Sequence, residues 1–124
     1  MKKTIILSIK PIYSQQIIDG SKKYEYRTKR PNCEIDRILI YESCPTKMII
    51  GEVLVKRIIK SSPKELWNMT NLYSGISKVK YNKYFKNRNI AYAYELGDVN
   101  LYEKKKLLSD YGVKSPPQSF VYLD

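Results

Sequence analysis

Short apolar runs separated by turn residues predict that much of the chain forms β-strands. Residues 4–9 have the character of a buried strand, and residues 36–42 are apolar on both faces, as in a central strand. Residues 48–59 are the longest strand-like stretch and are rich in isoleucine and valine. Residues 90–96 alternate tyrosine with alanine, which favours a strand whose small side chains face a tight interior or a pocket wall. Residues 119–123, after two prolines, are expected to form the terminal strand.

Helical patterns are inserted between these strands and do not alternate regularly with them. Residues 11–19 begin with a proline and end before Gly20, and a second helix is expected to begin after Ser62, which has the spacing of an N-terminal cap. Further helices are expected over residues 78–89 and 101–111. This order predicts a single α+β domain of all 124 residues, built on a small, curved, mostly antiparallel β-sheet or β-barrel with inserted helices.

Aromatic residues in two of the helical segments have two possible roles. Leu66, Met69 and Tyr73 recur at helical spacing with Trp67 beside them, which favours a role as core anchors. In residues 78–89, aromatic residues are interleaved with lysines. That pattern favours a core stripe with a solvated back, and a surface that binds single-stranded nucleic acid is the alternative.

Residues 20–27 combine a helix stop, the start of a strand and an ordered set of charges. On an extended chain Lys23, Glu25 and Arg27 share one face, and the tyrosines between them point to the other face. Two cations on either side of one carboxylate favour a recognition site for a polar ligand, such as the phosphate or base edge of a nucleotide. An ordinary ion pair at a strand edge is the alternative interpretation.

The charge of the chain favours an anionic partner. It carries 23 lysine and arginine residues against 12 acidic residues, for a net charge of +11. Residues 1–30 hold eight basic residues and two acidic ones. A basic surface of this size favours RNA or DNA over an anionic membrane, because no strongly amphipathic basic helix stands out. A lysine-rich surface that only maintains solubility is the alternative.

Other features of the composition exclude several kinds of chemistry. The chain has no histidine, which rules out a histidine general base, a Ser-His pair and a histidine-based zinc site. Cys33 and Cys44 are expected to be ordinary thiols, and we expect neither a metal nor a cofactor. No apolar run reaches the roughly 18 residues of a membrane span. The N-terminal run resembles the head of a signal peptide but is broken by Pro11, so a cytoplasmic location is expected.

A spacing motif, Gly-x-Lys-x-x-Glu-x-Arg, resembles that of the ASCH family. Its positions here are Gly20, Lys22, Glu25 and Arg27. The resemblance implies a PUA-like barrel (named after pseudouridine synthase and archaeosine transglycosylase) with a cleft lined by the lysine, glutamate and arginine. In the family this cleft is proposed to bind RNA or nucleotide-like ligands. Four further segments are similar to the family's first strand and helix entry, its central strands and its final strand: residues 7–11, 37–41, 50–53 and 116–120.

The leading hypothesis is a domain that binds single-stranded or modified RNA, or a nucleotide, in this cleft. Arg27 offers a planar fork to phosphate or to guanine-like edges, Lys22 and Lys23 add charge, and Glu25 accepts from a base amino group. A tyrosine of the 90–96 strand is expected to supply a stacking face. The remaining candidate ligand-binding residues are Ser43, Tyr92, Tyr94, Gln118 and Ser119.

Two further classes of function remain open. One is hydrolysis in the same cleft, with a desolvated Lys22 as base and Glu25 as acid or base. The resemblance includes a branch that hydrolyses N4-acetylcytidine with a lysine, a threonine and a glutamate, and a member reported as a ribonuclease. Lys22 matches the lysine of that branch, but Glu25 occupies the position at which the branch has its threonine. The other class is a protein-interaction module that uses the tyrosine-rich surface.

Overall fold

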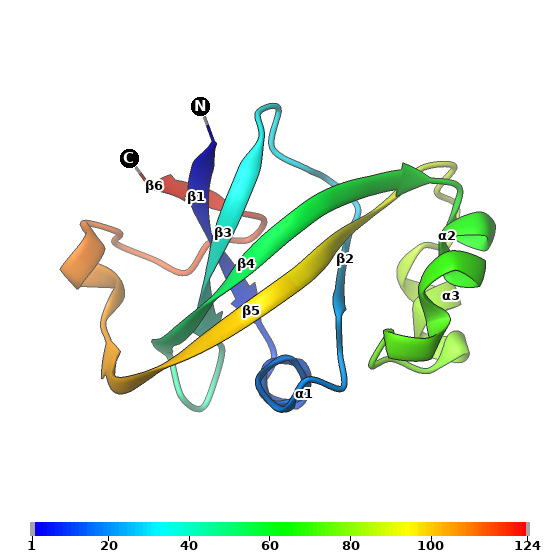
Figure 1. Cartoon of the computed structure of the whole chain (residues 1–124). Helices are drawn as coiled ribbons and strands as arrows, with labels where there is room; N and C mark the ends of the chain where they lie inside the picture. The colour runs from blue at the N-terminus through cyan, green and yellow to red at the C-terminus, as the bar shows by residue number, and fades with distance from the viewer. Residues whose placement is uncertain (1, 124) are drawn as a thin grey trace.

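The structure is a computed structural model that describes residues 2–123, and its centre is one sheet of six strands. Figure 1 shows the two longest strands crossing the middle of the molecule side by side. The strand order is β2-β5-β4-β3-β1-β6, and every neighbouring pair is antiparallel except β1 with β3, which is parallel. The strands are β1 (Lys3–Ile9), β2 (Tyr24–Arg27), β3 (Ile35–Glu42), β4 (Met48–Ser61), β5 (Ala91–Lys106) and β6 (Val121–Leu123).

The α+β class and the mostly antiparallel pairing agree with the sequence analysis, but the expected β-barrel is not closed. The strands at the two ends of the order, β2 and β6, do not pair with each other in the described chain. Both are short, with four and three residues, so neither offers a ladder long enough to join the two edges. The sheet is therefore strongly curved but open.

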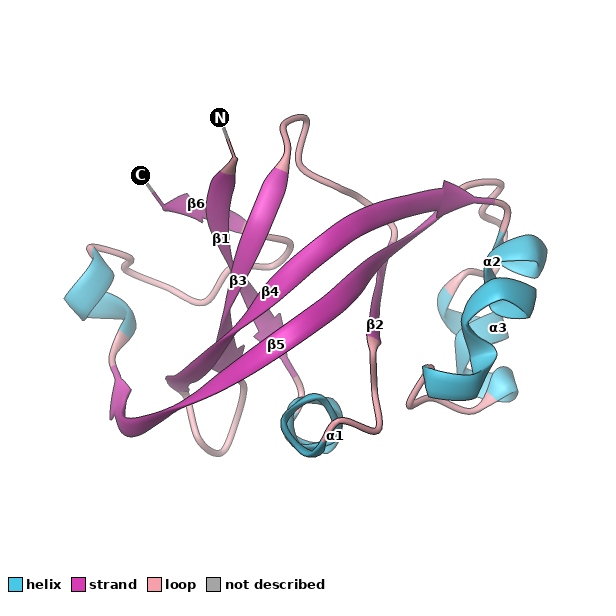
Figure 2. Ribbon diagram, in the orientation of Figure 1, coloured by secondary structure: helices cyan, strands magenta, loops and turns pink. Residues whose placement is uncertain are grey.

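Residues 2–123 form three α-helices, α1 (Pro11–Asp19), α2 (Pro63–Thr70) and α3 (Lys78–Tyr84). Figure 2 shows α2 and α3 at one end of the sheet and α1 beside it. Gly20 ends α1 with a left-handed φ of 86°, and the Ser62 side chain accepts a hydrogen bond from the Glu65 amide at the start of α2. These starts and stops agree with the sequence pattern, except that α3 ends five residues before the expected Asn89. No helix in residues 2–123 is long and apolar enough to span a membrane.

The helix expected over residues 101–111 is not formed. The end of β5 occupies most of this stretch and is followed by a short 3-10 helix, η2 (Leu108–Tyr111). The residues are good helix formers, but Leu101 pairs with Gly51 on β4, and this long-range pairing outweighs local preference. The terminal strand is also shorter than expected and begins at Val121.

Three groups of buried side chains make up the interior of residues 2–123, and the smallest comprises Ile6, Leu39, Tyr41 and Ile49. The largest lies between α1 and the centre of the sheet and includes Ile17, Ile38 and Tyr94. The second lies where α2 and α3 cover the far ends of β4 and β5, and it includes Tyr26 and Tyr81. Since β2 contributes Tyr26 to the second core, this strand runs between α1 on one side and α3 on the other.

Substitution of Gly51 tests the close approach of β4 and β5. A Cβ atom at this position would lie 2.6 Å from the Asn100 carbonyl oxygen and 3.1 Å from the Leu101 Cα, both backbone atoms. We expect Gly51→Ala to lower the free energy of unfolding by about 1–3 kcal/mol in urea denaturation, because the strands must separate. Gly97→Ala is the control, since its Cβ would meet nothing closer than 3.5 Å. Equal stability of the two variants would contradict this account.

Candidate functional site

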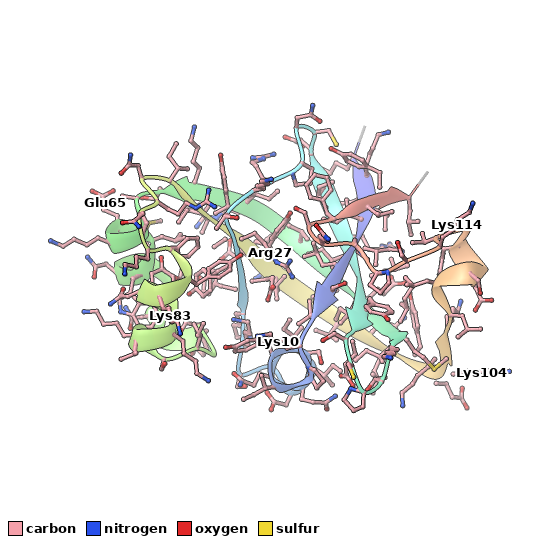
Figure 3. The ribbon with its side chains drawn as sticks, turned by 180° about the vertical axis from the view of Figure 1, so that it is seen from behind. Lys10, Arg27, Glu65, Lys83, Lys104 and Lys114 are labelled. Carbon is pink, nitrogen blue, oxygen red and sulfur yellow. The ribbon has the colours of Figure 1, made fainter. Side chains whose placement is uncertain are left out.

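A cleft of about 490 Å³ opens between α1, β2 and α3. In Figure 3, Arg27 of β2 lies above Lys10, which precedes α1, and Lys83 of α3 lies to the left of both; all three line the cleft. The base of the cleft is formed by β2 and by the residues just before it. The lining residues are Ser8, Ile9, Lys10, Tyr13, Lys22, Glu25, Tyr26, Arg27, Ile76, Lys80, Lys83 and Tyr84.

Arg27 and Glu25 form a tight ion pair at the base of the cleft. Nε and Nη2 of Arg27 both donate to Oε2 of Glu25, at 3.0 Å and 2.9 Å. Nη2 also donates to the Ser8 carbonyl of β1, at 2.7 Å. The side chains of Arg27 and Glu25 are only 16% and 10% exposed, so both are held rigidly. Neither Oε1 of Glu25 nor Nη1 of Arg27 takes part in these bonds.

Lys22 is a buried cation at the inner wall of the cleft. It is 3% exposed, and its ammonium donates to the Ser74 carbonyl and lies 5.2 Å and 5.0 Å from the ring centroids of Tyr13 and Tyr26. Such ring faces stabilise a cation. Burial nevertheless lowers the pKa of Lys22, against the opposing effect of Glu25, because the charged form has lost its water.

Gly75 allows the loop after η1 (Asn71–Tyr73) to close over Lys22. Its φ of +66° is left-handed, and a Cβ there would lie 2.8 Å from both Cβ and Cδ of Lys22. The same loop supplies the Ser74 carbonyl, which accepts from Lys22. The loop therefore fixes the position of the ammonium, and glycine satisfies both the backbone angle and the close contact.

A buried carboxylate anchors α1 and so positions one wall of the cleft. Glu42, at the end of β3, accepts hydrogen bonds from Ser14, Gln15 and Thr46 at 2.5, 2.8 and 2.6 Å. Burial alone raises the pKa of Glu42, but these hydrogen bonds outweigh it and hold the pKa below the ordinary value. Glu42 lies outside the cleft, and its role is to tie α1 to the turn between β3 and β4.

The residues expected from the sequence do not all lie in the cleft. Lys22, Glu25 and Arg27 do, whereas Lys23 is exposed and its ammonium lies 5.6 Å from the Tyr73 ring. Tyr26 also lines the cleft, although strand alternation put it on the opposite face. Lys23 does not share the face of Glu25 and Arg27, because β2 begins only at Tyr24 and strand alternation does not extend to Lys23.

None of the other candidate binding residues is among the residues that line the cleft. Tyr94 is fully buried in the core, and Tyr92 is half-buried on β5, paired in register with Arg27. Ser43 lies in the turn after β3, where its amide donates to the Ile9 carbonyl. The Ser8 hydroxyl donates to the Pro117 carbonyl, so the segment that contains exposed Gln118 and half-buried Ser119 passes beside the β1 wall.

The sequence analysis did not select the residues of α3 that face the cleft. The cleft is lined by Lys80, Lys83 and Tyr84, which belong to the stretch where aromatic residues are interleaved with lysines. In the same stretch Tyr81 and Phe85 are buried, in agreement with the expected core stripe. Tyr84, however, is 44% exposed. Its position between lysines in the sequence was the only sign that it could belong to a binding surface. Leu66 of α2 is buried as expected, but Met69 of α2 and Tyr73 of η1 are about half exposed and are not core anchors.

Comparison of the sequence and the fold with known proteins identifies the family of the chain. The ASCH domain family model matches residues 7–100. A solved ASCH structure from Zymomonas mobilis has a TM-score of 0.90 and 27% identity, covering 98% of this chain and 88% of that one. An ASCH domain-containing ribonuclease of Zymomonas mobilis is 28% identical over 98% of this chain and 85% of its own length. A large ribosomal subunit protein uL22 from Ureaplasma parvum is 30% identical, but the chain spans only 39% of its length.

Replacement of Lys22 by methionine tests whether its burial costs stability. We expect Lys22→Met to raise the free energy of unfolding at neutral pH, because the folded state no longer holds a desolvated charge. Between the lowered pKa of folded Lys22 and the unfolded value of about 10.4, the unfolded chain binds more protons, so the wild type gains stability as pH rises. The difference in free energy of unfolding between Lys22→Met and the wild type, measured by urea denaturation, should therefore decrease as the pH rises through that range.

Lys23→Met is the matched control for this test, because Lys23 is the exposed neighbour. We expect a small difference from the wild type that does not change over the same pH range. A lower stability of Lys22→Met at neutral pH would show that the contacts with Ser74 and the two tyrosine rings outweigh the cost of burial.

Proposed function

The chain belongs to the ASCH domain family, and we propose that it binds an unpaired nucleotide of single-stranded RNA in the cleft. The observation that carries this proposal is the convergence of Lys22, Glu25 and Arg27 on one concave surface. Arg27 and Glu25 are already held by protein bonds, so a ligand meets donors and acceptors that need little reordering. Nη1 of Arg27 donates to a phosphate or base oxygen, and Oε1 of Glu25 accepts from a base amino group.

The charge of the cleft suits a nucleic acid backbone. Among the lining residues, one carboxylate faces five cations, and the carboxylate is paired with Arg27. Lysines on both rims attract phosphates from either side, with an affinity that falls as salt rises. The cations are Lys10, Lys22, Arg27, Lys80 and Lys83.

Tyr84 is the stacking residue that we propose for an unpaired base. It lines the cleft from α3, and the residue remains 44% exposed. Tyr13 and Tyr26 also line the cleft, but each has its ring next to the Lys22 ammonium. Aromatic rings beside a basic groove are the usual way in which proteins hold unpaired bases. Tyr94, one of the two stacking candidates chosen from the sequence, is enclosed in the core and does not take this role.

RNA is the nucleic acid that the comparisons favour. The Zymomonas relative that matches over 85% of its length is named a ribonuclease. The lysine, threonine and glutamate set expected for N4-acetylcytidine hydrolysis is not assembled here, because the lining residues include no threonine and no carboxylate besides Glu25. A role as a protein-interaction module stays a prediction from the tyrosine content.

RNA cleavage is a second candidate, favoured by the lowered pKa of Lys22. An uncharged amine is a general base, and Lys22 would accept the proton of a ribose 2′-hydroxyl. The 2′-oxygen then attacks the adjacent phosphorus, the bond to the 5′-oxygen breaks, and that oxygen takes a proton from water. Arg27 would stabilise the negative charge that develops on the phosphate oxygens.

Arg27→Lys tests the binding proposal, because it keeps the charge and removes the planar fork. We expect single-stranded RNA to bind about tenfold more weakly, with an unchanged salt slope, in fluorescence anisotropy across a salt series. Lys83→Ala should instead reduce the salt slope by about one. Arg57→Lys is the control, since Arg57 is 62% exposed on β4 and pairs with Glu95 outside the cleft. Wild-type affinity in Arg27→Lys, with the fold intact by circular dichroism, would refute the proposed role.

The cleavage candidate is tested with Lys22→Met. We expect the wild type to cleave single-stranded RNA at a rate that rises with pH as Lys22 loses its proton, and Lys22→Met to lose at least about 100-fold. Lys23→Met, purified in the same way, should keep full activity, which controls for a contaminating nuclease. Equal cleavage by all three proteins, or none by the wild type over about pH 6 to 10, would leave binding as the function.

A further inference from the structure

A second groove lies on the other side of α3, between α3 and α2. It has a volume of about 570 Å³. Neither the family motif nor the cleft includes any of its residues. The lining residues are Ser62, Pro63, Lys64, Trp67, Asn68, Lys78, Asn82, Phe85, Arg88 and Asn89.

The polar lining of this groove is cationic and rich in amides. Lys64, Lys78 and Arg88 supply three positive charges, and no carboxylate is among the lining residues. The nearest acidic residue along α2, Glu65, accepts a hydrogen bond from the Ser61 hydroxyl at 3.2 Å. Three asparagines complete the polar lining, and each amide offers donors and an acceptor that match the edge of a base.

Trp67 gives the groove an aromatic surface. Its ring packs against Tyr81 with centroids 4.7 Å apart and an interplanar angle of 46°, and the side chain remains partly exposed. The inner contact fixes the indole, and the exposed part is available to a base. An aromatic ring among cations and amides is the composition of a site for unpaired nucleotides.

We propose that this groove is a second subsite for the same single-stranded RNA, an inference that rests on the proposed function of the cleft. The helix α3 separates the two sites and contributes to both. A helix is about 10–12 Å across, and stacked nucleotides are about 3.4 Å apart, so a strand that leaves the cleft reaches the groove within a few nucleotides. From α3 the cleft takes Lys80, Lys83 and Tyr84, and the groove takes Lys78 and Asn82.

The intrinsic fluorescence of Trp67 reports directly on the groove, because the chain contains one tryptophan. We expect a single-stranded RNA of about ten nucleotides to quench this fluorescence by stacking. A mononucleotide that fills the cleft alone should leave it unchanged. Duplex RNA of the same sequence should quench much less, because its bases are already paired and stacked.

Charge reversals separate the groove from the cleft. We expect Arg88→Glu and Lys64→Glu each to abolish the quenching and to weaken binding of the long RNA at least about tenfold. Binding of a mononucleotide should not change. Lys104→Glu is the matched control, because Figure 3 shows Lys104 at the opposite end of the molecule. Circular dichroism and urea denaturation verify that each variant is folded.

The outcomes distinguish this inference from the proposed function. If Arg27→Lys weakens RNA binding while Arg88→Glu and Lys64→Glu have no more effect than Lys104→Glu, the second subsite is refuted and the cleft stands. If the groove variants lose binding and quenching while Arg27→Lys does not, the groove is supported and the proposed role of the cleft fails. If RNA binds without any change in Trp67 fluorescence, or duplex RNA quenches it equally, the second subsite is also refuted.

Discussion

The guanidinium of Arg27 joins β2 to β1, two strands of the sheet that no backbone ladder in residues 2–123 pairs directly. β2 pairs only with β5 among the described strands, and β6 pairs with β1 only through residues 4–6 of β1. The carbonyl of Ser8 lies beyond that pairing, and Arg27 donates to it from β2. A side chain thus connects two strands where a barrel would have a hydrogen-bonded ladder. A single side chain fills less space than a paired strand. The cleft lies beside this link between β2 and β1.

The cleft also depends on burying charge, which is unfavourable unless each charge has partners. Arg27 and Glu25 neutralise each other, whereas Lys22 has a backbone carbonyl and two aromatic rings in place of a directly bonded carboxylate. Burial lowers the pKa of Lys22, and the nearby charge of Glu25 opposes this shift without reversing it. Neutral partners keep the ammonium in place without cancelling its charge, so its field still acts on the contents of the cleft.

Local chemistry made part of residues 20–27 predictable, and long-range pairing limited the rest. Gly20 ends a helix, and alternation then places Glu25 and Arg27 on the same side of a strand, but the same alternation misplaced Lys23 and Tyr26. The residues of α3 could not be assigned to the cleft in the same way. The position of α3 depends on the lengths of β4 and β5, because the second core, on which α3 packs, lies at the far ends of these strands. The same long pairing turned residues 101–106 from an expected helix into a strand. The loop over Lys22 is also a tertiary feature, and Gly75 was its only local sign.

The rotation of α3 determines which of its residues face each groove. Tyr81 and Phe85 are four residues apart, so both point inward from one side of the helix, and both are buried. The Tyr81 hydroxyl donates to the Pro63 carbonyl at 2.7 Å, which fixes α3 against the start of α2. With that side held, the two remaining flanks of α3 must face the cleft and the second groove. A change in this aromatic cluster therefore moves both surfaces together, so the packing of the second core positions the two surfaces proposed to bind RNA.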